Sequence, residues 1–370
     1  VVAFNFSVDL LTAMRSIRLL AAAQLINSLG FACLGVGLLL FVRASAGSVV
    51  IAYGGACLLT VAVLAVWRLR SWQPAPRPEQ NLPHVTFWGK LLPYVGWVTA
   101  GSLMANLFEI ADRYMIVHHA GTGAEASLAM VGQYHSSRVV PVLLVSVALM
   151  LGGMITPHLS DDWERGRRRE VGLRLNLFLK MLAFGLCAAA VGVLLLAPLL
   201  FGVAFEGKFA GGRAVLPWTL VYCIWFGLTM VAQNYLLCAE RARLGSIALL
   251  VGLTANVGLN LLLLPRLGLL GAVLATSAAN AVALVLVCAF AGMLGFRLDR
   301  GTRLMFAVPV SLAGGPWVAT AVLVAVAYEA ARGTDLLSVD EKHLLGDMIA
   351  DYWRRGRALL PRHRSASANP

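Results

Sequence analysis

Three cations lie inside long apolar stretches of this sequence, where a charged side chain is costly to place: Arg113, Arg138 and Lys180. The acidic residues Glu109 and Asp112 lie on the same stretch as Arg113. Charged side chains in such surroundings usually face a water-filled cavity or pair with one another. A guanidinium also presents a planar fork of donors that fits phosphate and carboxylate groups. These residues are therefore candidates either for binding a charged or polar ligand between apolar helices or for pairing with one another.

The stretch that holds Arg113 predicts a polar stripe along one helix. Asn106, Glu109 and Arg113 are spaced i, i+3 and i+7, so they share a helical face that can line a cavity. The alternative is a local i,i+4 salt bridge between Glu109 and Arg113 that only makes the two charges tolerable. Asp112 points to another side of the helix, and we expect it to cap or pair at the outer interface.

The next apolar stretch carries Gln133, Tyr134 and Arg138 near its start. Tyr134 and Arg138 lie four residues apart and share a face, so these residues either line the cavity or anchor the helix at the interface, where tyrosine is favoured. Lys180 lies about a turn and a half inside a later span. It either extends its ammonium to the cytoplasmic interface or meets an anionic ligand at the inner gate.

Amide side chains provide a third group of candidates. Gln233 lies late in one apolar stretch, and Asn256 and Asn260 are spaced i,i+4 on the next. They either hydrogen-bond between helices or bind the hydroxyl groups of a ligand. The six cysteines form no CxxC pair, so the sequence predicts neither a disulfide framework nor a metal site. No sequence motif indicates a cofactor.

Composition decides which elements must position these residues. Of the 370 residues, 59% are hydrophobic and 13% are charged, whereas a soluble domain has about 45–50% apolar and about 25% charged residues. The mean hydropathy is +0.78, too high for a water-soluble globule. A soluble enzyme and a nucleic-acid-binding module are therefore excluded, and the net charge of +12 is interpreted as basic cytoplasmic loops.

The fold class predicted is an all-α integral membrane protein. Each candidate span is continuously apolar, without the alternation of a β-barrel strand. Lys and Arg gather in loops such as 165–169, which places these loops inside, whereas the loop 118–127 contains neither. Nine stretches are apolar and long enough to span a membrane: 17–42, 47–67, 91–117, 127–157, 175–202, 214–238, 244–264, 268–294 and 304–331.

An internal repeat predicts the domain organisation. LLTAMR at 10–15 resembles LLCAER at 236–241, and both lead into a long apolar helix, a turn and a second helix. Two parallel lobes of six helices follow, with about four helices expected before Val1. The predicted parts are the last two helices of an incomplete N-terminal lobe (1–70), a cytoplasmic linker (71–87), a complete six-helix C-terminal lobe (88–294), an extra transmembrane or re-entrant segment (304–331) and a polar basic tail (332–370).

The order of short motifs from about Asp9 to Leu294 resembles the Wzx-type flippases of the superfamily that also holds lipid II flippases and multidrug extruders. The motifs are KLLP at 90–93, DR at 112–113, VGQY at 131–134, PHLS at 157–160, and N-x-x-x-N, P and G-x-x-G-A over 256–272. The tail after Arg332 does not match.

The resemblance implies transfer of undecaprenyl-pyrophosphate-linked oligosaccharide across the bacterial inner membrane by alternating access, for O-antigen, capsule or exopolysaccharide synthesis. The pyrophosphate would meet Arg113, Arg138 or Lys180. Expected partners are this substrate, membrane lipids and other polysaccharide-assembly proteins, and not nucleic acid. We weigh two alternatives, a cation-coupled multidrug extruder of the same superfamily and a membrane polysaccharide polymerase or ligase. The exterior loops are short and lack catalytic motifs, so we expect no enzyme.

Overall fold

The computed structural model describes residues 1–14, 16–42, 44–70, 83–120, 123–333, 335–338, 341–342 and 345–346. Every regular element in these ranges is helical, and eight helices there are long and apolar enough to cross a membrane. The predicted fold class, an all-α multi-pass membrane protein, is confirmed. Arg15 of the repeat motif, most of the predicted linker 71–87 and most of the tail 332–370 lie outside the described residues.

The chain divides into two compact units, Val1–Pro83 and His84–Pro370. The first contains α1 (Val2–Ala13), α2 (Ile17–Phe41) and α3 (Ala46–Arg70). Its two long helices pack closely, because Gly30 on α2 faces Ala56 on α3. The helices α2 and α3 fall where the first two spans are predicted.

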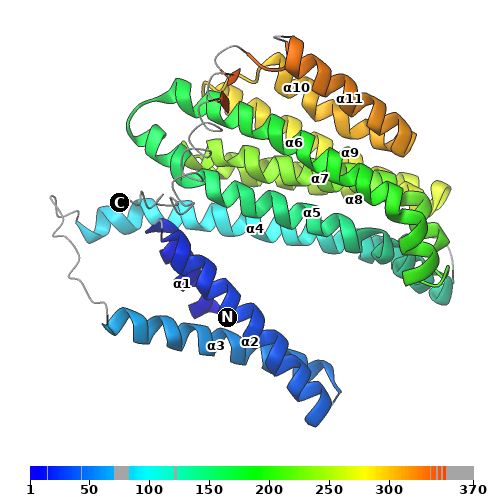
Figure 1. Cartoon of the computed structure of the whole chain (residues 1–370), viewed down its shortest axis with the longest axis horizontal. Helices are drawn as coiled ribbons and strands as arrows, with labels where there is room; N and C mark the ends of the chain where they lie inside the picture. The colour runs from blue at the N-terminus through cyan, green and yellow to red at the C-terminus, as the bar shows by residue number, and fades with distance from the viewer. Residues whose placement is uncertain are drawn as a thin grey trace, which may run out of the picture. The chain divides into compact units, whose positions relative to one another are not determined.

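The second unit is a bundle whose long helices run side by side, with α4 at one edge and α11 at the other (Figure 1). The helix α7 lies at its centre, since it is the most buried of the spans. The bundle consists of α4 (His84–His119), α5 (Ala124–Glu164), α6 (Arg168–Leu199), α7 (Ala210–Cys238), α8 (Ala242–Leu267), α9 (Leu269–Met293), α10 (Arg300–Ala307) and α11 (Pro316–Arg332).

Several helices extend further than the apolar stretches that predict them. The span predicted at 127–157 is part of α5, which ends at Glu164 and is followed by Gly166 with a φ of 77°. The span predicted at 175–202 begins seven residues earlier, because α6 starts at Arg168. Hydropathy marks the part of a helix inside the hydrocarbon, whereas caps and turns fix where the helix ends.

The predicted ninth stretch, 304–331, is not one continuous helix. It is divided among α10, a 3-10 helix over Val308–Gly314 and α11, with the break at Gly315, whose φ of 91° suits glycine. Pro316 follows at the first position of α11, where a proline is well accommodated. With 17 residues, α11 is shorter than the roughly 20 residues that cross a bilayer.

Small residues let α7 approach closely to α5, the helix that carries Arg138. A Cβ added at Gly212 on α7 would lie 2.5 Å from the carbonyl oxygen of Gln133 on α5. Further along the same contact, a Cβ at Gly227 would lie 2.8 Å from Ala148 Cβ. Such small-residue contacts are typical of membrane helices, where close packing replaces the hydrophobic effect.

We expect Gly212→Ala to lower the free energy of unfolding by about 1–3 kcal/mol, because the new methyl group overlaps the α5 backbone. The matched control is Gly192→Ala on α6, where an added Cβ meets nothing within 4 Å. The thermal unfolding midpoint of the purified chain in detergent measures both. Equal midpoints for the two variants would contradict the close α5–α7 contact.

Candidate functional site

The side chain of Asp112 on α4 is the centre of a buried hydrogen-bond network; the residue is 1% exposed. Asn256 Nδ2 and Asn260 Nδ2, both on α8, donate to its Oδ1 at 3.0 and 3.2 Å. Thr276 Oγ1 on α9 and Tyr134 Oη on α5 donate to its Oδ2 at 2.8 and 2.5 Å. One carboxyl group therefore accepts hydrogen bonds from three neighbouring helices.

Helical spacing brings these donors together. Asn256 and Asn260 lie one turn apart on α8, so both amides reach the same oxygen. Asn256 also donates to Thr276 at 3.1 Å, which ties α8 to α9. The hydroxyl of Tyr222 on α7 lies 3.3 Å from that of Tyr134 and extends the network to the central helix. The expectation that Asp112 pairs at the outer interface is replaced by this buried position.

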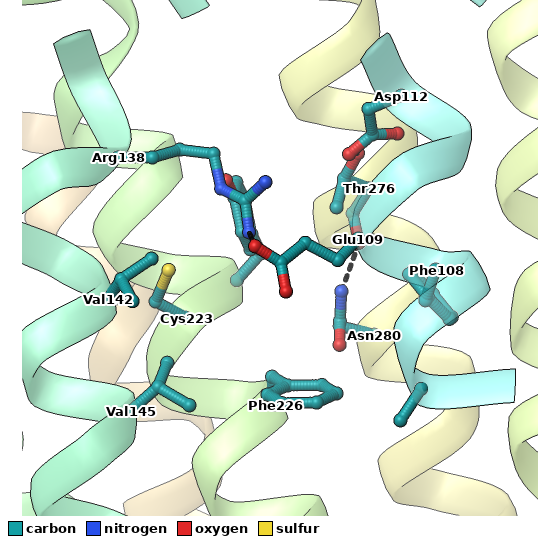
Figure 2. Close-up of a pocket in the computed structure, with 12 residues that line it drawn as sticks. Phe108, Glu109, Asp112, Arg138, Val142, Val145, Cys223, Phe226, Thr276 and Asn280 are labelled. Carbon is teal, nitrogen blue, oxygen red and sulfur yellow. Dashed lines mark hydrogen bonds and ion pairs between the residues drawn. The ribbon is translucent and has the colours of Figure 1, made fainter. Parts of the chain in front are cut away.

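A pocket lies beside the network, between α4, α5, α7 and α9 (Figure 2). Its volume is about 80 Å³, enough for a few water molecules at roughly 10–15 Å³ each. Asp112 and Arg138 both line it, while several of the remaining walls are apolar. The lining residues are Ala105, Phe108, Glu109, Asp112, Arg138, Val142, Val145, Tyr222, Cys223, Phe226, Thr276 and Asn280.

The guanidinium of Arg138 projects into this pocket toward Glu109 (Figure 2). Its Nη2 lies 3.4 Å from Glu109 Oε1, and its side chain is only 10% exposed. The guanidinium also lies 5.5 Å from the ring centre of Tyr134, a weak cation–π contact. Within the described residues, Arg138 Nε and Nη1 are buried and have no hydrogen-bond partner. A buried guanidinium with unused donors can bind an oxyanion.

Glu109 also pairs with Arg113, the other arginine that the sequence singled out. Arg113 Nη2 lies 3.7 Å from the same oxygen, Glu109 Oε1, so the i,i+4 pair considered as an alternative does form. Glu109 also lines the pocket, whereas Arg113 is not among the lining residues. Glu109 therefore both lines the pocket and forms the predicted ion pair.

The other candidate side chains lie apart from the pocket lining. Asn106 is exposed and donates to Ser102 O of its own helix at 2.8 Å. Gln133 Oε1 accepts the backbone N–H of Gly212 at 3.0 Å, which is a packing role between α5 and α7. Gln233 lies against Gly245 of α8.

Lys180 belongs to a separate buried cluster that includes the chain beyond α11. Its ammonium donates to Asp299 Oδ2 at 2.5 Å and to Glu341 Oε1 and Oε2 at 2.8 and 2.7 Å. Asp299 in turn caps α10 by accepting the N–H of Thr302. Lys180 and Glu341 are 4% and 1% exposed. The cluster therefore holds the described residues 341–342 against α6 and the start of α10.

We expect Lys180→Met to release this segment, because it leaves the Glu341 carboxylate buried without a counter-charge, at a cost of about 3–5 kcal/mol for a fully buried pair. Limited proteolysis of the folded chain should then cut near residues 335–342. The control is Lys208→Met, which removes an exposed ammonium from its pair with Glu206. Identical cleavage patterns for both variants would contradict the anchoring role.

The sequence analysis did not predict several residues of the site, although the sequence pattern of two of them could have indicated it. Thr276 and Asn280 are polar, lie i,i+4 on one apolar span and line the pocket; this is the same pattern that identified Asn256 and Asn260. Tyr222 is one of two tyrosines, with Tyr235, in the apolar stretch 214–238 and carries no comparable signal.

We expect a replacement at Asp112 to lower the free energy of unfolding more, the fewer hydrogen-bond acceptors the new side chain has. Asp112→Leu removes the acceptor that four hydrogen bonds share and should cost at least about 2 kcal/mol, since each buried hydrogen bond contributes about 0.5–1.5 kcal/mol. Asp112→Asn keeps one acceptor oxygen and should cost less. Thermal unfolding measures the order, with the exposed Glu206→Gln as control. A leucine variant as stable as the original chain would contradict the conclusion that Asp112 holds the hydrogen-bond network together.

The arrangement can bind charged groups of either sign. Arg138 offers unused donors to an oxyanion, whereas the Asp112 carboxyl group and the buried, unpartnered Asn260 Oδ1 are oxygen ligands of the kind that hold a small cation or a proton. Among the described residues, no group of three or more His, Cys, Asp and Glu residues could hold a metal ion. A scan against protein-family models found no match, and searches of curated proteins and of solved structures found no similar protein.

Proposed function

We propose that the protein is a transporter that moves undecaprenyl-pyrophosphate-linked oligosaccharide across the bacterial cytoplasmic membrane. The observation that carries the proposal is Arg138, a guanidinium that is almost fully buried and has two nitrogens without hydrogen-bond partners in the described structure, at the wall of a pocket. The substrate's fixed charge is its pyrophosphate, and a pyrophosphate supplies several oxygens to such a fork.

The pocket wall suits an anionic group that is attached to an apolar one. Phe108, Val142, Val145 and Phe226 form its apolar part, and Arg138 lies at its polar end (Figure 2). Ligand sites commonly combine apolar walls with a few placed polar groups that set orientation. A pyrophosphate would bind at Arg138 while the isoprenoid stays in contact with apolar surface.

The size of the pocket supports a mechanism with moving helices. About 80 Å³ accommodates water but not a sugar chain, so the helices around it must separate before the head group enters. Alternating access provides this movement, because a site near the middle of the membrane opens to one side at a time. In the proposal the protein makes and breaks no covalent bond, and its partners are the lipid-linked substrate, membrane lipids and other polysaccharide-assembly proteins.

A cation-coupled extruder of the same superfamily is the second candidate, and Asp112 favours it. This carboxyl group is buried and surrounded by neutral oxygen- and nitrogen-bearing side chains, which is a chemically suitable environment for a coupling ion. Dye efflux from cells or proteoliposomes that depends on a sodium or proton gradient would support this candidate. Efflux without lipid-linked glycan transport would replace the proposed substrate.

We expect Arg138→Gln to reduce glycan export at least tenfold in a flippase-deficient strain that the original gene restores. The amide keeps much of the side chain's polarity but removes the charge that the pyrophosphate meets. The control is Arg266→Gln, at an exposed position outside the site. Membrane expression of each variant is measured alongside export. Export by the Arg138 variant at the control level would contradict the proposed substrate contact.

A further inference from the structure

Glu109 is held more loosely than a structural ion-pair residue. Its Oε1 lies 3.4 Å from Arg138 Nη2 and 3.7 Å from Arg113 Nη2, whereas charge-assisted hydrogen bonds are about 2.7–2.9 Å long. Both guanidinium groups share this one oxygen. In the described part of the chain, no donor forms a hydrogen bond with the Glu109 carboxylate, and its side chain is 50% exposed.

The neighbouring acidic residue shows what a fixed carboxyl group looks like in this bundle. Asp112 lies three residues further along α4, is 1% exposed and accepts four hydrogen bonds from other helices. None of these four bonds comes from Arg138. The two acidic residues therefore differ in kind, because Asp112 is built into the helix contacts and Glu109 is held by charge alone.

The counter-ion of Arg138 therefore lies where a ligand's oxyanion would lie. Arg138 Nε and Nη1 keep unused hydrogen-bonding capacity while Nη2 faces Glu109 across the pocket (Figure 2). A phosphate can approach closer than 3.4 Å and can use more than one nitrogen, so it forms a stronger pair with the guanidinium than Glu109 does. Glu109 can withdraw without breaking any hydrogen bond seen in the described structure.

We propose that Glu109 is a displaceable counter-ion: it neutralises Arg138 when the site is empty, and the phosphate of a pyrophosphate-linked lipid must displace it to bind. This inference rests on the proposed function and adds to it. Glu109 lowers the affinity for the anion and returns to Arg138 as the anion leaves. A transporter benefits from such competition, because a site that binds its cargo too tightly releases it slowly.

The test is the binding of farnesyl pyrophosphate to the purified chain in lipid nanodiscs, with inorganic pyrophosphate in a parallel series. Glu109→Gln removes the competing charge but keeps the shape, so we expect the Kd for both probes to fall about fivefold to tenfold. Glu109→Ala should change the Kd in the same direction. Glu206→Gln, at an exposed pair with Lys208, should leave it unchanged. Tighter binding of the farnesyl compound than of inorganic pyrophosphate measures the contribution of the lipid tail.

The other outcomes separate the two proposals. If the original chain binds the probe, Arg138→Gln abolishes binding and Glu109→Gln binds equally or more weakly, the counter-ion proposal is overturned while the proposed function stands. If Glu109→Gln and the original chain both fail to bind either probe, Arg138 is not an anion site and both proposals fall. Size-exclusion profiles that match the original chain establish that each variant is folded.

Discussion

A carboxyl group buried among apolar helices must have its acceptor positions filled, and the second unit is organised around meeting this requirement at Asp112. Its four hydrogen bonds come from α5, α8 and α9. A membrane interior offers little hydrophobic drive between helices, so close contacts of small residues and such polar bonds hold a bundle together. The network fixes α4 against its neighbours, and the pocket lies alongside it.

Arg138 depends on the same arrangement. Tyr134, one turn earlier on α5, donates to Asp112, and this bond sets the rotation of α5 that turns Arg138 toward the pocket. Gly212 and Gly227 allow α5 and α7 to approach, which buries the guanidinium. A residue with so little access to solvent needs a partner of opposite charge. Glu109 provides one at 3.4 Å, and we infer that a bound phosphate would take its place.

The helices were well predicted from the sequence. A long apolar stretch without strand-like alternation can form its backbone hydrogen bonds inside a membrane only as a helix. Among the polar residues singled out in such stretches, Arg138 and Glu109 line the pocket, whereas Asn256 and Asn260 donate to Asp112. That any of them binds a ligand stays a prediction. The central position of Asp112 was not predicted, because helical spacing gives the side of α4 on which Asp112 lies and not which helix covers that side.

Lys180 illustrates the same limit at longer range. Its partners Asp299 and Glu341 are 119 and 161 residues away in the chain, and no local pattern connects them. The cluster explains how a lysine is accommodated in α6 without a ligand. The Lys180 cluster, which holds the chain beyond α11, is therefore separate from the charges that line the pocket.

An electron cryomicroscopy structure of the chain with farnesyl pyrophosphate would show whether Arg138 binds an anion inside the bundle. We expect phosphate density within hydrogen-bond distance of Arg138 Nε or Nη1, with the Glu109 carboxylate moved away from Nη2. Phosphate density elsewhere, with the pair between Arg138 and Glu109 intact, would contradict anion binding at Arg138.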